Sequence, residues 1–146
     1  MKKTGILNAA LICELTKIRH KDKLVICDAG FPIPKDANVV DVSLVAGIPS
    51  MLQVLKAVLN EIIVEDYTIF DKTKEANPEY YDFVTGIFQV QEHHEADMDG
   101  FIAQAQAAKL FIRTGELRPC SNIMLTSATG VRSRCDAMDI CFDEIG

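Results

Sequence analysis

The chain has 146 residues, a formal net charge of −6, and 49% hydrophobic and 25% charged residues. This length and composition predict one globular domain with a core of useful size. The acidic balance lacks the basic footprint of nucleic-acid binding, so nucleic acid is set aside as a partner. No apolar run approaches the roughly 20 residues of a membrane-spanning helix, and no signal peptide is apparent, so we expect no membrane partner.

Cysteine usage predicts the redox environment. The five cysteines are odd in number and widely spaced, and no C-x-x-C pair occurs, so zinc binding and dithiol redox chemistry are weakly supported. A reduced cytoplasmic protein with mostly buried thiols is the simplest interpretation. These residues are Cys13, Cys27, Cys120, Cys135 and Cys141.

Apolar patterning near the start of the chain predicts a helix, a strand and a rigid loop. Asn8 suits the N-cap of a helix over residues 9–18, where apolar residues recur at helical spacing. Residues 23–27 are expected to form a buried strand, because L-V-I-C is continuously apolar. Prolines then exclude residues 31–34 from a helix or a strand ladder, so an extended loop follows.

The same alternation continues to about residue 127. Ser50 suits the N-cap of a helix over residues 51–63, whose apolar arc is wide enough to favour contact with another subunit. Strands alternating with helices predict a single-domain α/β fold, with a mainly parallel sheet flanked by helices. The other expected elements are strands over residues 38–44, 64–70, 110–112 and 122–126, and helices over residues 78–88 and 99–108.

The stretch around the first strand is the leading candidate for an active site. His20 precedes this strand and Asp28 ends it, and ligands of open α/β sheets bind just past the carboxyl ends of strands. Imidazole titrates near neutrality and suits proton transfer. His20 could instead cap the preceding helix, and Asp28 could cap a turn. Asp22 is expected to be structural, bonded near His20.

Other polar residues receive structural interpretations. His93 and His94 are adjacent, so they rarely bind one ion together, and their acidic surroundings predict a solvated loop without a metal. Arg113 and Glu116 are expected to form a structural turn and an ion pair. Two aspartates, Asp41 and Asp71, interrupt apolar strands, and one of them could face the site or a subunit interface.

Five sequence blocks occur in order over about residues 2–127, and together they resemble the D-ribose pyranase / L-fucose mutarotase family. The block D-A-G-F-P-I-P is more similar to the ribose branch than to the fucose branch. The blocks are K-K-T-G-I-L-N (2–8), H-x-D (20–22), V-I-C-D-A-G-F-P-I-P (25–34), D-V-S-L-x-x-G-I-P-S (41–50) and I-R-T-G-E (112–116), followed by Asn122.

This resemblance implies an α/β enzyme that interconverts the pyranose and furanose forms, or the anomers, of a free monosaccharide. It implies no metal and no organic cofactor, and a ring-forming homo-oligomer, commonly a decamer, with the sugar site between neighbouring subunits. The general acid/base of the family corresponds to His20, and its sugar-binding aspartate to Asp28. Asp28 would accept hydrogen bonds from the sugar and could also orient His20.

Two departures from the family pattern fall on its sugar-binding positions. The usual Tyr-Ala-Asn triplet is Cys120-Ser121-Asn122 here, and a second sugar-binding histidine corresponds to Met98. Asn122 is therefore carried over directly, whereas Cys120, Ser121 and Met98 are altered substrate-binding positions.

D-ribose is the first substrate to expect. A fucose-type or other-sugar mutarotase, or a sugar-binding homologue that has lost catalysis, remain alternatives. The expected sugar mutarotase domain covers residues 1–129. Residues 130–146 form an atypical tail, acidic near its end, which we expect to be poorly ordered or to pack on a neighbouring subunit.

Overall fold

The computed structural model describes residues 1–137 and 140–146. Its centre is a six-stranded sheet in the order β2-β5-β1-β6-β3-β4, in which only β6 runs against its neighbours. The expected mainly parallel α/β sheet is therefore confirmed. The strands are β1 (Lys23–Cys27), β2 (Val39–Asp41), β3 (Val64–Phe70), β4 (Glu92–Ala96), β5 (Leu110–Arg113) and β6 (Ile123–Ser127).

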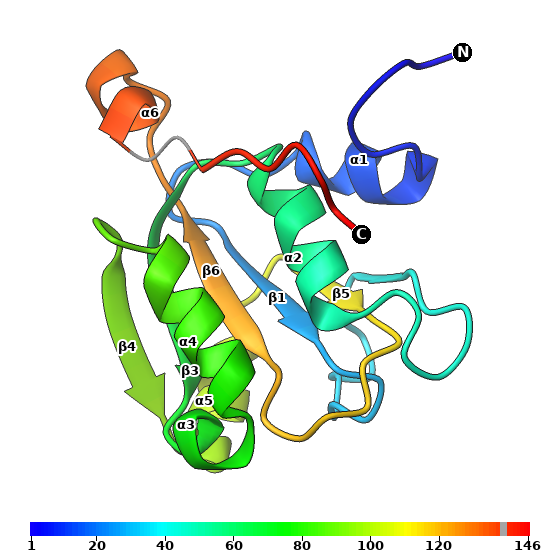
Figure 1. The fold of residues 1–146 in the computed structure, drawn as a ribbon, viewed down its shortest axis with the longest axis vertical. Coiled ribbons are helices and arrows are strands. Elements are labelled where there is room, and N and C mark those ends of the chain that lie inside the picture. The colour runs from blue at the N-terminus through cyan, green and yellow to red at the C-terminus, as the bar shows by residue number, and fades with distance from the viewer. Residues whose placement is uncertain (138–139) are drawn as a thin grey trace.

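Helices cover both faces of the sheet, with α2 and α4 on one face and α5 on the other (Figure 1). The first face holds the larger apolar cluster, around Leu55, Val84 and Leu125. The second holds a smaller cluster, in which Phe101 packs between Phe31 and Phe70. The helices are α1 (Ala9–Leu15), α2 (Met51–Leu59), α3 (Thr73–Ala76), α4 (Pro78–Ile87), α5 (Met98–Ala105) and α6 (Arg132–Ala137).

Four helices begin at side-chain caps. Asn8, Asn77 and Asp97 each accept a backbone N–H of the first turn, and Ser50 forms a capping box with Gln53. Each cap satisfies N–H groups that the helix itself leaves without a partner. These residues fix where each helix starts, and the expected caps at Asn8 and Ser50 are confirmed.

Helix ends and one strand differ from the sequence-based expectations. Helix α1 ends at Leu15, so His20 lies in a separate turn and does not cap that helix. Residues 92–96, expected to be a loop, form strand β4 at the edge of the sheet. An edge strand with exposed faces needs no apolar pattern, which is why E-H-H-E-A gave no strand signal.

The last residues of the C-terminal tail pack on their own chain, whereas packing of the tail on a neighbouring subunit stays a prediction. Ile140 and Phe142 pack against the main core of their own chain. Phe142 stacks on Phe83, and its backbone N–H and carbonyl bond the Asn60 side chain at 2.7 and 2.8 Å. The tail therefore helps to cover the apolar arc around α2, whereas the expected acidic Asp139 lies outside the described residues.

Thiols are more exposed than expected. All five cysteines are free, but only Cys27 is buried, so the expectation of mostly buried thiols was wrong. Within the described part of the chain, no helix is long and apolar enough to cross a membrane.

Candidate functional site

The carboxyl edge of the sheet brings Asp28 and Asn122 together. Asp28 directly follows β1, and Asn122 directly precedes the antiparallel β6, so both lie at the same edge. The Asp28 backbone N–H donates to Asn122 Oδ1 at 2.9 Å, and Asn122 Nδ2 donates to Asp28 Oδ2 at 3.0 Å. With Asn122 only 2% exposed, this reciprocal pair fixes the direction of the carboxylate.

Short contacts hold the loop that carries Asp28. Asp28 Oδ1 accepts the N–H of Gly30 at 3.0 Å, so the expected turn-capping role is also present. The next residue, Ala29, donates its N–H to the Glu116 carbonyl at 2.9 Å and accepts a bond from Arg113 Nε at 3.0 Å. The loop is therefore anchored to the segment after β5.

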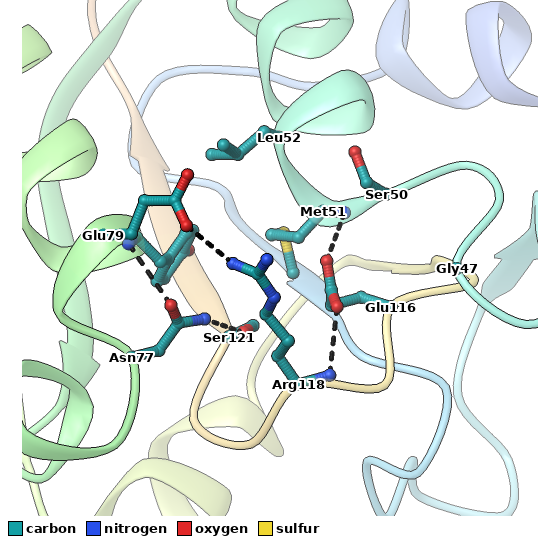
Figure 2. A pocket seen from close by; sticks show the side chains of 10 residues that line it. Gly47, Ser50, Met51, Leu52, Asn77, Glu79, Glu116, Arg118 and Ser121 are labelled. Atoms are coloured by element: carbon teal, nitrogen blue, oxygen red, sulfur yellow. Dashed lines mark hydrogen bonds and ion pairs between the residues drawn. The ribbon is translucent and has the colours of Figure 1, made fainter.

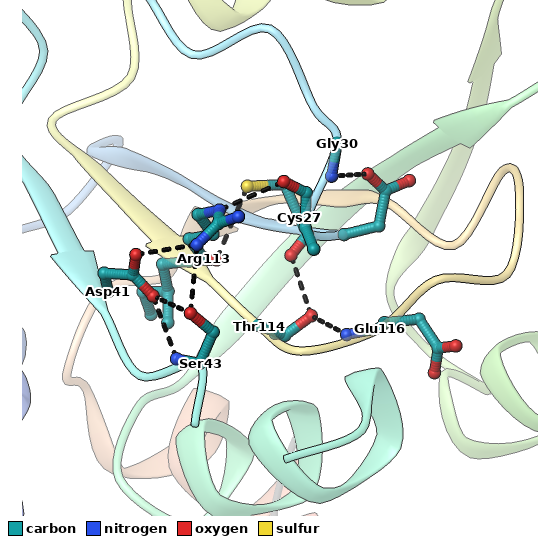
Figure 3. Close-up of polar contacts among 10 residues, drawn as sticks. Cys27, Gly30, Asp41, Ser43, Arg113, Thr114 and Glu116 are labelled. Carbon is teal, nitrogen blue, oxygen red and sulfur yellow. Dashed lines mark hydrogen bonds and ion pairs between the residues drawn. The ribbon is translucent and has the colours of Figure 1, made fainter. Parts of the chain in front are cut away.

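Arg113 is structural, as expected, but the expected ion pair with Glu116 was wrong, because Arg113 pairs with Asp41 and the Glu116 carboxylate accepts backbone N–H groups instead. Figure 3 shows the guanidinium beside the Asp41 carboxylate, at 2.9 Å, and the Ser43 hydroxyl, at 3.0 Å. Burial works to raise the pKa of Asp41, but hydrogen bonds from Ser43 and the Arg113 guanidinium hold it below its ordinary value. Asp41 thus anchors Arg113, which in turn holds the loop after β1.

Cys120 lies near the Asp28 carboxylate. Its backbone has a positive φ of 55°, and its carbonyl accepts a hydrogen bond from Thr73 Oγ1 at 3.2 Å. Burial raises the pKa of the Cys120 thiol, and the charges of Asp28 and Asp71 raise it further. A neutral thiol is a poor nucleophile, so Cys120 can line a site more readily than react in it.

Ser121, the residue before Asn122, faces helices α2 and α4 and contacts Asn77. Its hydroxyl accepts a hydrogen bond from Asn77 Nδ2 at 2.8 Å and lines a hollow of about 350 Å³ beside α2 and α4 (Figure 2). Across this hollow Arg118 pairs with Glu79 at 3.0 Å. The Ser121 hydroxyl is therefore engaged by Asn77.

Met98 begins helix α5, which the Asp97 side chain caps through the Gly100 N–H at 2.7 Å. Its side chain is 60% exposed, and it follows β4 at the carboxyl edge of the sheet. Strands β6 and β3 lie between β4 and β1 in the sheet order. Met98 therefore lies on the expected edge, several strands away from the end of β1.

His20 lies at the amino end of the central strand β1, on the opposite side of the sheet from the carboxyl ends of the parallel strands. It precedes β1, whereas Asp28 follows it, and this five-residue strand spans roughly 16 Å at about 3.3 Å per residue. The idea that Asp28 orients His20 is therefore wrong within one chain. His20 is half exposed, and its Nε2 lies 3.3 Å from Oε2 of Glu65. Asp22 is structural, as expected, and accepts the Arg19 N–H at 2.7 Å.

The paired histidines of β4 contact different partners. His93 contacts the buried Tyr67 hydroxyl at 2.7 Å through Nδ1 and Glu95 at 2.9 Å through Nε2. His94 lies 3.6 Å from Glu92. Among the residues that the structure describes, no group of three His, Cys, Asp or Glu side chains is placed to hold a metal ion.

Comparison with known proteins assigns the family. The sequence model of the RbsD / FucU transport protein family matches residues 1–131. The chain belongs to this family. A D-ribose pyranase of Geobacillus thermodenitrificans is 39% identical over 127 residues, which cover 87% of this chain and 96% of that protein.

Solved structures agree with this assignment. Bacillus subtilis RbsD complexed with D-ribose has a TM-score of 0.85 and 34% identity, covering 90% of this chain and 100% of that one. FucU from Bifidobacterium longum has a TM-score of 0.71 and 23% identity, covering 86% and 96%, and shares the fold. Identity is therefore higher to the RbsD structure than to the FucU structure.

Two polar neighbours of the expected site residues in this RbsD/FucU family member were missed from the sequence. Glu65 contacts His20, and Thr73 donates a hydrogen bond to the Cys120 carbonyl. Asp71, one of the two aspartates expected to face the site or an interface, lies near Cys120. Glu65 lies 45 residues from His20 in the sequence, so no local pattern could link the two.

Proposed function

We propose that this protein is a D-ribose pyranase-like isomerase, which interconverts the pyranose and furanose forms, or the anomers, of a free monosaccharide. The observation that carries the proposal is the reciprocal Asp28–Asn122 pair at the carboxyl edge. It occurs in a chain 34% identical to an RbsD that was solved with D-ribose. D-ribose is therefore the first substrate to test.

The reaction requires proton transfer at a hemiacetal. Ring opening removes a proton from the anomeric hydroxyl and adds one to the ring oxygen, and closure through another hydroxyl reverses both transfers. In the proposal His20 moves this proton, because imidazole titrates near neutrality. Asp28 accepts hydrogen bonds from sugar hydroxyls through lone pairs that Asn122 and Gly30 leave available. Cys120, Ser121 and Met98 are proposed as altered lining positions.

If His20 and Asp28 act on the same sugar, as proposed, their separation along β1 implies a site built by two subunits. One chain supplies the Asp28–Asn122 pair, and a neighbouring copy supplies His20. In a ring of identical subunits every interface is the same, so each would hold one complete site. This arrangement supports the proposed homo-oligomeric ring, and a decamer is the expected size.

An exposed apolar patch beside Asp28 suits such a subunit contact. Leu44, Val45, Ile48 and Leu117 are 77%, 59%, 53% and 65% exposed. A hollow of about 290 Å³ is lined by Leu44, Val45 and Leu117 of this patch and by Ala29, the residue after Asp28. The loop that carries the patch is joined to the segment after β5, because Gly47 donates its N–H to the Gly115 carbonyl at 2.6 Å. Contiguous exposed apolar side chains mark interaction surfaces.

The altered lining supports a second candidate, a mutarotase for another sugar. Cys120 places a small neutral thiol where the family usually has tyrosine, and this leaves room for a different substituent on the sugar. A sugar-binding protein without catalysis is the third candidate. The five free thiols are consistent with the proposed cytoplasmic location, where thiols stay reduced.

The proposed activity can be tested by saturation-transfer NMR on ribose, fucose, galactose and allose. We expect the wild-type protein to accelerate exchange between the forms of D-ribose, and His20→Ala to lose this acceleration. Faster exchange with another sugar would select the second candidate, and binding without acceleration would select the third. Wild-type exchange rates in His20→Ala would contradict the catalytic assignment.

A further inference from the structure

The turn that carries His20 is held in an unusual backbone conformation. The next residue, Lys21, has a positive φ of 69°, which side chains with a Cβ rarely adopt. Its backbone N–H donates to the Ser127 carbonyl at 2.9 Å, and Asp22 donates its N–H to the Arg19 carbonyl at 3.0 Å. Such a conformation persists only where the surroundings determine it, often at functional sites.

A second irregularity faces this turn. Strand β3 shifts its register on β6, because Val64 pairs with Ser127 whereas Asp66 pairs with the adjacent Thr126. Glu65 is the extra residue between them. A bulge of this kind changes the direction of a side chain and is common next to active sites. The bulge in β3 and the left-handed Lys21 therefore meet at Ser127.

The Glu65 carboxylate lies between the two side chains of the turn. Oε2 lies 3.3 Å from Nε2 of His20, and Oε1 accepts a hydrogen bond from Lys21 Nζ. The Glu65 side chain is only 10% exposed, whereas those of His20 and Lys21 are 50% and 68% exposed. Burial works to raise the pKa of Glu65, but Lys21, and to a lesser degree His20, hold it below its ordinary value.

We propose that Glu65 is the positioning residue for His20, an inference that rests on the proposed function. Its carboxylate accepts a hydrogen bond from the Nε2–H of His20, which leaves Nδ1 as the nitrogen that takes the proton from the anomeric hydroxyl. The same Nδ1 then returns that proton to the ring oxygen. The negative charge of Glu65 stabilises the imidazolium that exists between these two transfers.

Glu65→Gln tests this role, and Lys21→Gln is its matched control. Both variants remove the Lys21–Glu65 ion pair, but only the first removes the charge facing His20. We expect Glu65→Gln to lower kcat for D-ribose exchange by about tenfold or more with little change in KM. We expect Lys21→Gln to keep kcat within about threefold of wild type, because this variant retains the Glu65 carboxylate that faces His20. Equal losses in both variants would overturn the inference in favour of a structural ion pair.

Nitrogen-15 NMR of the imidazole gives a second readout that holds even if Glu65→Gln fails to fold. When the His20 ring of the wild-type protein is neutral, we expect it to carry its proton on Nε2, and a proton on Nδ1 would overturn the inference. His20→Asn separates the two proposals. Wild-type exchange in His20→Asn would remove the proposed function itself. If His20→Asn is inactive while Glu65→Gln is fully active, only the role of Glu65 fails.

Discussion

Replacement of Asn122 by alanine should destabilise the carboxyl edge measurably. The variant loses two hydrogen bonds to Asp28. In one, at 2.9 Å, the Asp28 backbone N–H is the donor, and in the other, at 3.0 Å, the Asp28 carboxylate is the acceptor. A neutral hydrogen bond contributes about 1 kcal/mol and a charged one about 1.5–3 kcal/mol. Because Asn122 is 2% exposed, water cannot easily replace both bonds. We therefore expect a loss of about 3 kcal/mol in the free energy of unfolding.

Urea unfolding followed by circular dichroism measures this loss, at one fixed protein concentration because assembly would shift the midpoint. The matched control is Asn38→Ala, which also removes an asparagine with two side-chain bonds, here to Glu14 and the Lys109 carbonyl. Asn38 is exposed, so its loss should be below about 1 kcal/mol. A cost for Asn122→Ala no larger than that of Asn38→Ala would refute the reasoning about the buried pair.

Four further predictions address assembly, pH, the tail and the thiols. Leu117→Asp should reduce the assembled mass in light scattering and abolish exchange while the fold persists, and an unchanged mass would argue against the patch. The Lys109 ammonium holds the pKa of Asp22 below its ordinary value, with the Arg19 N–H adding to this against the effect of burial. This stabilisation is present above about pH 4 and lost as pH falls through the folded pKa, so Asp22→Asn should be less stable than wild type at pH 7 but equal to it at low pH. Phe142→Ala should cost about 1–2 kcal/mol in urea unfolding through its lost contacts with the core. Burial raises the pKa of Cys27 to about 12, so this thiol should be alkylated only upon unfolding, as peptide mapping would show.

A continuous apolar run made the central strand β1 predictable. Strands β1 and β3 were both predicted with their observed bounds, and β1 is apolar from Leu24 to Cys27 because both of its faces are covered. Strand β4 was missed for the opposite reason, since its exposed edge position imposes no apolar pattern. Helices α1 and α2 are shorter than expected, because apolar spacing continues beyond Leu15 and Leu59, where the helical hydrogen bonding ends. The antiparallel direction of β6 depends on the whole topology and leaves no local signal.

The candidate site was predictable in its residues but not in its geometry. Asp28 was expected at the end of β1, and the structure adds its pairing with Asn122, 94 residues away. His20 and Asp28 were expected to flank β1, and the length of this strand rules out the further expectation that Asp28 orients His20 within one chain. The contact with Glu65 depends on a bulge and a left-handed lysine, neither of which a sequence pattern specifies.

Mixing two inactive variants tests the central claim of a sugar isomerase site shared between subunits. His20→Ala and Asp28→Ala would be unfolded together, refolded as mixed rings and assayed by saturation-transfer NMR on D-ribose. We expect each variant alone to be inactive and the mixture to regain about a quarter of wild-type exchange, because one interface in four then joins an intact His20 to an intact Asp28. No recovery in mixed rings that have the wild-type mass would contradict the account.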